Sequence, residues 1–411
     1  MAATRAACYV RRMSQPRADT LSINEVLEDE WRRWTERGRE RALRSAWHRR
    51  GAEVVTADGP AVDFSSNDYL GLASDERVVR AAVAALETDA IGAAASRLIA
   101  GDHPAHERLE AAIAAHFNAP RAVTFNTGFS ANVGSIPALA GPRDAIFADA
   151  LNHASLIDGC RLSGASVHVY QHADAAALRA QLAAHRSGAR HALIVTDGLF
   201  SMDGDLAPLA GIVELAAEFG AWTYVDDAHA VGVVGPGGRG TAAAAGLDGR
   251  VDVTVGTLGK AFGTAGAFVY GSPQLARHLI NRARSFVFST AMLPAQAAAS
   301  CEALRIAARE PERRARLFAN AGRLRTALAS HGDALLGGAG SHVVPLLVGA
   351  NEATVAAGRA LRERGLLVGA VRPPTVPEGR ARLRISVSAA HTDAHIDTLA
   401  AALSEIHPSS G

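Results

Sequence analysis

Seven short apolar segments, most of them followed by a helical stretch, dominate the middle of this 411-residue chain. They are almost continuously apolar, which is typical of strands that helices cover on both faces. Such strands alternating with helices predict an α/β fold with a mostly parallel sheet. We expect these strands at Ala122–Phe125, Ala145–Ala148, Val167–Tyr170, Ala192–Thr196, Trp222–Val225, Val251–Val255 and Ala267–Tyr270.

The two ends of the chain have patterns of their own. Leu21–Arg50 predicts a charged helix, and two short strands are expected near residues 53–64, where they can join a later sheet. After Pro294, helices and strands alternate again on a smaller scale. The predicted domains are a poorly ordered extension at 1–20, an N-terminal helix with small strands at 21–65, a large cofactor-binding domain at 66–300 and a small C-terminal domain at 301–411.

Composition excludes several classes of protein. A formal net charge of +1 gives no basic excess for nucleic acid, and no apolar run is long enough to cross a membrane. Cys8, Cys160 and Cys301 lack metal-binding spacing, so we predict no metal site and a reduced, cytoplasmic location. Met1–Arg17 has the Ala and Arg content of a transit peptide, but we favour a disordered or misassigned start, with Met13 as another initiator.

One stretch, Tyr224–Gly263, combines three chemical groups. Asp226 ends a predicted strand, His229 follows three residues later, and Lys260 lies just past the next strand. Pyridoxal 5′-phosphate (PLP) needs an anion at its ring nitrogen, a donor at its phenolic oxygen and an amine for its aldehyde. The stretch therefore predicts a PLP site at the carboxyl ends of the strands.

Other candidate residues follow strands or begin helices. Thr127–Phe129 opens a helix whose N–H groups suit a phosphate, although alone it is an ordinary turn. His153 suits stacking on a flat ring, although alone it is more often a surface or capping residue. Ser201 can donate to a cofactor oxygen, whereas Asp203 and Asp205 are expected to be turn formers.

Two later segments add hydroxyl groups and arginines. Phe288–Thr290 offers the hydroxyls of Ser289 and Thr290 to a phosphate, either in the same subunit or in a partner subunit. On the segment Arg382–Ser386, one of two arginines can hold a substrate carboxylate with two parallel hydrogen bonds. The alternative is a pair of surface arginines on an edge strand.

Together these motifs resemble one family, the PLP-dependent α-oxoamine synthases of the fold-type I aminotransferase superfamily. The resemblance runs from Leu21 to the C-terminus. It implies a large domain with a mostly parallel seven-stranded sheet between helices, a smaller C-terminal domain, and a homodimer with shared active sites. The motifs that carry it are Asn67–Gly71, Thr127–Phe129, Asn152–Ser155, Phe200–Asp205, Asp226–His229 and Thr257–Lys260.

The resemblance also implies a role for each matching residue. Lys260, His153 and Asp226 would be catalytic: the lysine binds the aldehyde, the histidine stacks on the ring, and the aspartate pairs with the ring nitrogen. Further cofactor contacts would come from Gly128, Phe129, Ser201, His229 and Thr257, with Ser289 and Thr290 from the second subunit. Substrate contacts would come from Arg44, Asn67, His153, Thr375 and Arg384, of which Arg384 holds the amino-acid carboxylate.

The segment Arg372–Pro377, with Arg382–Arg384, resembles family members that condense L-alanine with a pimeloyl thioester and release carbon dioxide, in biotin biosynthesis. Coenzyme A and acyl carrier protein both remain open as the thiol carrier. One alternative is a sibling that uses glycine or serine, of the 2-amino-3-ketobutyrate ligase or serine palmitoyltransferase type. The other is a PLP-binding protein without turnover.

Overall fold

The computed structural model describes residues 21–338 and 340–406, in an N-terminal unit that ends at Arg44 and a main unit from Ser45 onward. The predicted extension at 1–20 lies outside the described residues. In the N-terminal unit, helix α1 (Ile23–Glu36) begins at Ser22, which forms a capping box with Glu25. The prediction of a helix up to Arg50 is wrong: Gly38 has a φ of 61° just past the helix end, and Ala46–Arg50 form strand β1.

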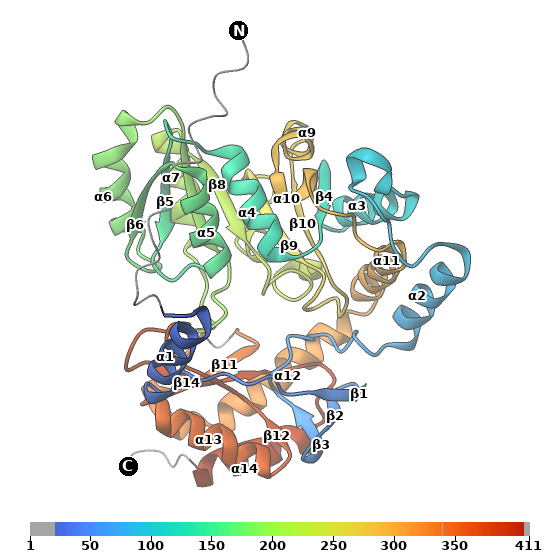
Figure 1. Ribbon diagram of the computed structural model, residues 1–411, viewed down its shortest axis with the longest axis vertical. Coiled ribbons are helices and arrows are strands. Elements are labelled where there is room, and N and C mark those ends of the chain that lie inside the picture. The colour runs from blue at the N-terminus through green and yellow to red at the C-terminus, as the bar shows by residue number, and fades with distance from the viewer. Residues whose placement is uncertain (1–20, 339, 407–411) are drawn as a thin grey trace. The chain divides into compact units, whose positions relative to one another are not determined.

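A seven-stranded sheet forms the centre of the main unit, in the order β4-β10-β9-β8-β7-β5-β6 (Figure 1). β10 pairs antiparallel with both neighbours, and the other neighbouring strands pair parallel. This confirms the predicted sheet. The strands are β4 (Arg121–Phe125), β5 (Ala145–Asp149), β6 (Ser166–Tyr170), β7 (Ala192–Asp197), β8 (Trp222–Asp226), β9 (Val253–Thr257) and β10 (Ala267–Gly271).

Helices bury both faces of the central strands of this sheet, which explains why those strands are mostly apolar, whereas the edge strand β6 is largely exposed. Alternate residues of one strand enter different cores: Ile146 packs with Leu156 and Leu279, whereas Phe147 packs with Leu178 and Ile212. One face is covered by α4 (Gly128–Leu139), α5 (Ala154–Ser163), α9 (Pro273–Arg282) and α10 (Arg284–Val287). The other is covered by α6 (Ala175–His185), α7 (Leu209–Phe219) and α8 (Thr241–Ala244).

A third group of helices packs beside β10 around Phe268, and it includes α2 (Glu76–Thr88), α3 (Pro104–His116) and α11 (Pro294–Arg309). A π-helical segment, Arg97–Gly101, lies between α2 and α3 in the sequence. Short 3₁₀ segments occur at Arg186–Gly188, Pro236–Gly238 and Ala329–Ala334.

The C-terminal part is a smaller α/β layer, as predicted. Its antiparallel sheet has the order β11-β14-β13, formed by Val343–Gly349, Ala381–Ser386 and Gly369–Val371. The surrounding helices are α12 (Pro311–Ala327), α13 (Asn351–Glu363) and α14 (Asp393–Ile406). The early strands β1, β2 (Glu53–Thr56) and β3 (Gly59–Asp63) form a further sheet, in which β3 pairs parallel with β12 (Leu366–Leu367). Segments about 300 residues apart in sequence thus share one sheet, as the sequence suggested.

No helix within residues 21–338 and 340–406 has the length and apolar character needed to cross a bilayer.

Candidate active site

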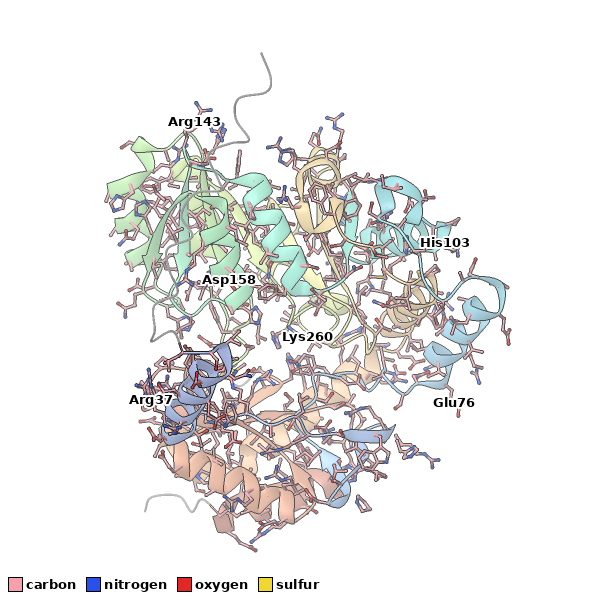
Figure 2. The ribbon with its side chains drawn as sticks, in the orientation of Figure 1. Arg37, Glu76, His103, Arg143, Asp158 and Lys260 are labelled. Atoms are coloured by element: carbon pink, nitrogen blue, oxygen red, sulfur yellow. The ribbon has the colours of Figure 1, made fainter. Side chains whose placement is uncertain are left out.

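Lys260 is the only lysine in the 411 residues, so it is the only side-chain amine that can bind an aldehyde. It follows β9, between the seven-stranded sheet and the C-terminal layer (Figure 2). Among the described residues, its amine has no hydrogen-bond or ion-pair partner. Burial lowers the pKa of Lys260 to about 8, against the opposing effect of the Asp226 and Asp197 carboxyls. A buried amine near two acids fits a site for an aldehyde cofactor.

Two aspartates end neighbouring strands beside this lysine, because Asp197 and Asp226 are partners in the register of β7 and β8. Asp226 accepts hydrogen bonds at both oxygens: Oδ2 from Asn132 Nδ2 at 2.6 Å, and Oδ1 from the Ala228 N–H at 3.0 Å. Asp197 Oδ2 accepts from the His153 N–H at 2.7 Å. Parallel strand ends thus bring together groups that the sequence separates.

His153 is the N-cap of α5, and the side chain of Ser155 reaches back to its ring. Ser155 Oγ lies 2.7 Å from His153 Nδ1, and the Ser155 N–H donates to the same atom at 3.3 Å. Burial lowers the pKa of His153, which favours a neutral ring. A neutral imidazole at a fixed angle suits stacking on a flat cofactor.

His229 is tied to the C-terminal layer through Tyr69. The Tyr69 hydroxyl lies 2.6 Å from His229 Nδ1, and it accepts from Arg384 Nη2 at 3.4 Å. Asn67 Oδ1 accepts from both the Tyr69 hydroxyl and Arg384 Nη1. Burial, followed by the charges of Lys260 and Arg384, holds the pKa of His229 well below its ordinary value. The predicted cofactor ligand His229 and the predicted substrate ligands Asn67 and Arg384 therefore form one network.

Arg382 and Arg384 are both buried on β14, with exposures of 1% and 7%. Because β14 is the central strand of its sheet, the alternative of two surface arginines on an edge strand is wrong. Arg382 forms an ion pair with Asp203 and also donates to the Met202 carbonyl. Arg384 has no carboxylate partner among the described residues, and its hydrogen bonds go to uncharged groups: the Ser201 carbonyl, Asn67, Ser386 and Tyr69.

The beginning of α4 supplies free N–H groups near the end of β9. Thr127 caps the helix by accepting from the Ser130 N–H, whereas the N–H groups of Gly128 and Phe129 have no partner among the described residues. A Cβ at position 128 would lie 2.8 Å from Thr257 Cγ2, so the close approach requires glycine. Two free N–H groups beside a threonine suit a phosphate.

The side chains of several predicted residues are not brought into these networks by any described contact. Ser201 joins through its carbonyl, and its hydroxyl has no described partner. Thr290 accepts from Asn126 Nδ2 at 2.7 Å, and Ser289 lies beside it in a small pocket that includes Arg97. Thr375 is exposed in the segment between β13 and β14. Arg44 ends the N-terminal unit, so its role stays a prediction.

Sequence reasoning missed two of the residues that build the site. Asn132 and Tyr69 are buried and bind predicted site residues directly. Tyr69 lies inside the motif Asn67–Gly71, and Asn132 lies one helical turn after Gly128, so helical spacing was an available signal.

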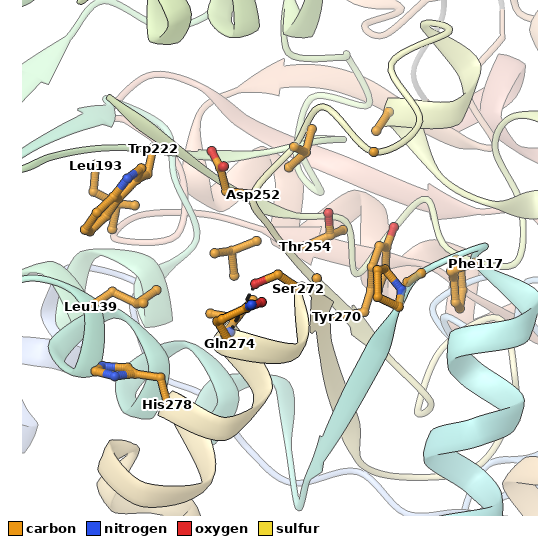
Figure 3. A pocket seen from close by; sticks show the side chains of 18 of the residues that line it. Phe117, Leu139, Leu193, Trp222, Asp252, Thr254, Tyr270, Ser272, Gln274 and His278 are labelled. Carbon is orange, nitrogen blue, oxygen red and sulfur yellow. Dashed lines mark hydrogen bonds between the residues drawn. The ribbon is translucent and has the colours of Figure 1, made fainter. Parts of the chain in front are cut away.

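A cavity of about 740 Å³ lies elsewhere, at the opposite ends of the central strands of the seven-stranded sheet (Figure 3). Its lining includes Trp222, which begins β8, and Gly271, which ends the antiparallel β10. Two lining arginines are already paired, Arg190 with Asp144 and Arg239 with Asp248. The cavity contains none of the predicted site residues, so its size does not mark the site of chemistry.

The fold and the arrangement around Lys260 define a PLP-dependent enzyme of fold type I. The sequence pattern of the family Aminotransferase class I and II matches residues 60–403. Similar solved structures include a serine palmitoyltransferase from S. paucimobilis with bound PLP and myriocin, 31% identical with a TM-score of 0.89, covering 94% of this chain and 98% of that one. The cofactor of this class, PLP, is therefore the cofactor of the chain.

Curated relatives identify the branch of the family. The 8-amino-7-oxononanoate synthase of Methylococcus capsulatus is 50% identical over 356 residues, which cover 86% of this chain and 91% of the relative. That of Anaeromyxobacter dehalogenans is 47% identical over 372 residues, 90% of this chain and 93% of the relative. A solved 8-amino-7-oxononanoate synthase from Francisella tularensis is 28% identical with a TM-score of 0.72, covering 84% and 97%. The chain belongs to the 8-amino-7-oxononanoate synthase family.

Proposed function

We propose that this enzyme condenses L-alanine with a pimeloyl thioester and releases carbon dioxide and the thiol carrier, giving 8-amino-7-oxononanoate for biotin biosynthesis in the cytoplasm. Membership of the family supports the reaction. The main structural support is the buried guanidinium of Arg384. It has no anion among the described residues, and it is connected to His229 by hydrogen bonds through Tyr69. A buried cation without a partner is costly, and an amino-acid carboxylate is a suitable partner.

PLP, when bound, supplies an aldehyde that binds amines and a ring that draws electrons from the adjacent carbon. Lys260 is the residue suited to hold the aldehyde, and Asp226 the ring nitrogen. His153 is proposed to stack on the face of the ring, and His229 and Ser201 are proposed to contact the phenolic oxygen. The N–H groups of Gly128 and Phe129, with Thr257, suit the phosphate.

The amine of Lys260 is also the candidate general base. At a pKa of about 8, roughly one amine in ten is uncharged at pH 7, and only an uncharged amine can accept the α-proton of L-alanine. A positioned base contributes about 10²–10⁴-fold. Lys260→Ala should lose more, because the cofactor's attachment is lost as well. Borohydride treatment of the holoenzyme should fix PLP on one peptide, that of Lys260, and a wild-type turnover rate in the alanine variant would refute the assignment.

Arg384 and Asn67 are proposed to bind the carboxylate of L-alanine, while Arg44 and Thr375 are proposed to contact the substrates. The support for Arg384 over Arg382 is chemical, since Arg382 already has Asp203 as its anion. We also propose that the cofactor-binding domain begins near residue 66 and ends near residue 300, where the small C-terminal domain follows.

A homodimer with shared sites is the proposed assembly. Large apolar side chains are exposed next to Ser289 and Thr290: Phe288 is 70% exposed and Ile99 is 82% exposed. These segments adjoin, because the Ala291 N–H donates to the Ala95 carbonyl and the Arg97 guanidinium lies over the Phe286 ring. A second copy of the chain would cover them and bring its Ser289 and Thr290 to the neighbouring cofactor.

Subunit mixing tests this assembly. Lys260→Ala and the double variant Ser289→Ala/Thr290→Ala should each be weakly active, whereas a refolded mixture should regain activity. In a mixed dimer, one site then combines an intact Lys260 with the intact hydroxyls of the other subunit. A mixture no more active than its two components would contradict shared sites.

The alternative of a glycine- or serine-using sibling has less support. Backbone similarity is higher to the serine palmitoyltransferase, with a TM-score of 0.89 against 0.72 for the solved 8-amino-7-oxononanoate synthase. Sequence identity points the other way, at 47–50% to curated 8-amino-7-oxononanoate synthases and 31% to that serine palmitoyltransferase. We give identity more weight, because side chains decide the substrate and the fold is common to the whole family.

The decisive experiment measures thiol and carbon dioxide release with L-alanine, glycine or L-serine, each with pimeloyl-CoA and with pimeloyl-carrier protein. We expect release only with L-alanine, at equal amounts of thiol and carbon dioxide, and the better thioester identifies the carrier. Faster turnover of glycine or serine with another acyl thioester would replace the proposal by the sibling reaction. Bound PLP without thiol release from any thioester would favour the non-catalytic alternative.

A further inference from the structure

Asn132, on α4, connects by hydrogen bonds to Asp226 and, through Ser155, to His153, the two predicted catalytic residues that are assigned to the cofactor ring. We propose that Asn132 is a positioning residue, whose single side-chain amide orients the Asp226 carboxylate directly and the His153 ring through Ser155. This inference rests on the proposed function and names a further residue that the proposed reaction depends on.

The amide of Asn132 uses both of its N–H donors and its oxygen inside the protein. The residue has 0% exposure. Its Nδ2 donates to Asp226 Oδ2 at 2.6 Å and to Ser155 Oγ at 2.8 Å, while its Oδ1 accepts from the Tyr224 hydroxyl at 2.8 Å. A rotated amide would place its oxygen against the carboxylate of Asp226, so the hydrogen-bond partners determine which amide atom is the nitrogen and which is the oxygen.

On the first branch, Asp226 is held from two sides. Asn132 donates to Oδ2 and the Ala228 N–H donates to Oδ1, so the carboxylate cannot turn without losing one of these bonds. Each oxygen keeps a lone pair for a further donor. The geometry therefore presents a fixed carboxylate edge to the protonated ring nitrogen that Asp226 is proposed to bind.

On the second branch, the direction of the hydrogen bonds sets the tautomer of His153. The Ser155 N–H is always a donor, and it points at His153 Nδ1. Ser155 Oγ accepts from Asn132, so its own hydrogen is available for the same Nδ1 at 2.7 Å. Nδ1 therefore accepts, and the hydrogen of a neutral His153 ring lies on Nε2.

The position of Asn132 also joins these branches to the phosphate end of the site. It follows Gly128 by four residues, one turn along the same helix face. A single rigid helix thus begins with the N–H groups proposed for the phosphate and carries the amide that orients the groups proposed for the ring.

The test begins with Asn132→Leu, which keeps the size but removes both donors. The matched control is Asn320→Leu: Asn320 is equally buried on α12, and it donates to the carbonyls of Ser388 and His391 at 3.0 and 2.9 Å. Both variants should lose stability. Only Asn132→Leu should weaken PLP binding to the apoenzyme and lower kcat, each on the order of 10- to 100-fold, as expected when reacting groups are misplaced.

Two milder variants keep the proposal testable if Asn132→Leu does not fold. Ser155→Ala removes the hydroxyl that links Asn132 to His153 and leaves the hydrogen bond from Asn132 to Asp226. It should alter the absorption spectrum of the holoenzyme and retain most of the PLP affinity. In Asn132→Asp, the new carboxyl group donates to Asp226 only when protonated. Its kcat relative to wild type should therefore rise as the pH falls from 8 to 6, a change that a merely structural role would not produce.

PLP affinity and the absorption spectrum are measured without substrate. Their outcome therefore does not depend on which thioester the enzyme condenses. Wild-type PLP affinity and spectrum in Asn132→Leu would overturn the positioning role, as would losses equal to those of Asn320→Leu. A flat pH ratio for Asn132→Asp would overturn it as well.

Discussion

Asp197 and Asp226 lie opposite each other at the ends of β7 and β8, yet their surroundings differ. Burial, and next the neighbouring charge of Asp226, raise the pKa of Asp197 well above its ordinary value. Asp226 instead accepts one hydrogen bond at each oxygen, from Asn132 and Ala228. Two adjacent buried carboxyl groups thus differ in their environments.

We predict that the asparagine substitution affects these two positions very differently. Asp197→Asn replaces an acid whose pKa is raised by burial with a neutral group that still accepts from the His153 N–H, so kcat should change by less than about threefold. Asp226→Asn removes the anion from the ring nitrogen, so kcat should fall by roughly 10²-fold or more. Steady-state kinetics at pH 7.5 decide this, and equal losses in the two variants would contradict it.

The sheet and the motifs were predictable because they depend on local patterns. Continuous apolar runs predicted all seven strands of the large sheet, and residues next to strand ends marked the candidate site. Contacts between distant residues were not predictable in the same way. Asp203 was expected to be a turn former, yet it pairs with Arg382 across 179 positions of sequence. A single sequence contains no pattern that joins two such positions.

His172 should stabilise the loop that carries Ser201 in a pH-dependent manner. Its two ring nitrogens lie 2.9 Å from Asp149 and 2.8 Å from Asp205, and these hydrogen bonds raise the pKa of His172 to about 10. Because the pKa is raised on folding, the stabilisation is complete below about pH 6.5 and is lost as the pH rises towards 10. His172→Gln should lower the free energy of unfolding by about 1–2 kcal/mol at pH 6.

Urea unfolding at pH 6 and at pH 9.5 measures this effect, and the gap between wild type and His172→Gln should narrow at the higher pH. His185→Gln is the control, because His185 is an exposed histidine whose one ring contact among the described residues is the stack on His168. A gap that is the same at both pH values would show that the charge of His172 contributes nothing.

Lys260 should destabilise the apoenzyme. Burial lowers its pKa from 10.5 to about 8, so the folded state disfavours the charged amine. The cost is present below about pH 8 and is relieved as the pH rises from 8 to 10.5. Lys260→Met should therefore stabilise the apoenzyme at pH 7 by about 1–3 kcal/mol, and the gain should shrink near pH 10. Urea unfolding of the PLP-free proteins measures it, and a less stable Lys260→Met variant would refute the inference.

Arg382 and Arg384 should give opposite results to the same substitution. Both are buried on one face of β14, but only Arg382 has an anionic partner, Asp203. Arg382→Met leaves Asp203 unpaired, and it should cost about 2–4 kcal/mol of stability, towards the lower end for buried pairs because Asp203 is partly exposed. Arg384→Met removes a buried cation that has no anion among the described residues, so stability should fall little or even rise.

The kinetic effects should be reversed. Arg384→Met should raise the KM for L-alanine on the order of 100-fold while leaving the KM for the thioester near its wild-type value, since a bidentate carboxylate contact is lost. Arg382→Met, assayed well below its unfolding midpoint, should keep the KM for L-alanine within about threefold, because its guanidinium is already occupied by Asp203 and the Met202 carbonyl. If Arg382→Met raised that KM more than Arg384→Met did, the carboxylate of L-alanine would bind to Arg382 and not to Arg384. The absence of an anion near Arg384 would then need another explanation.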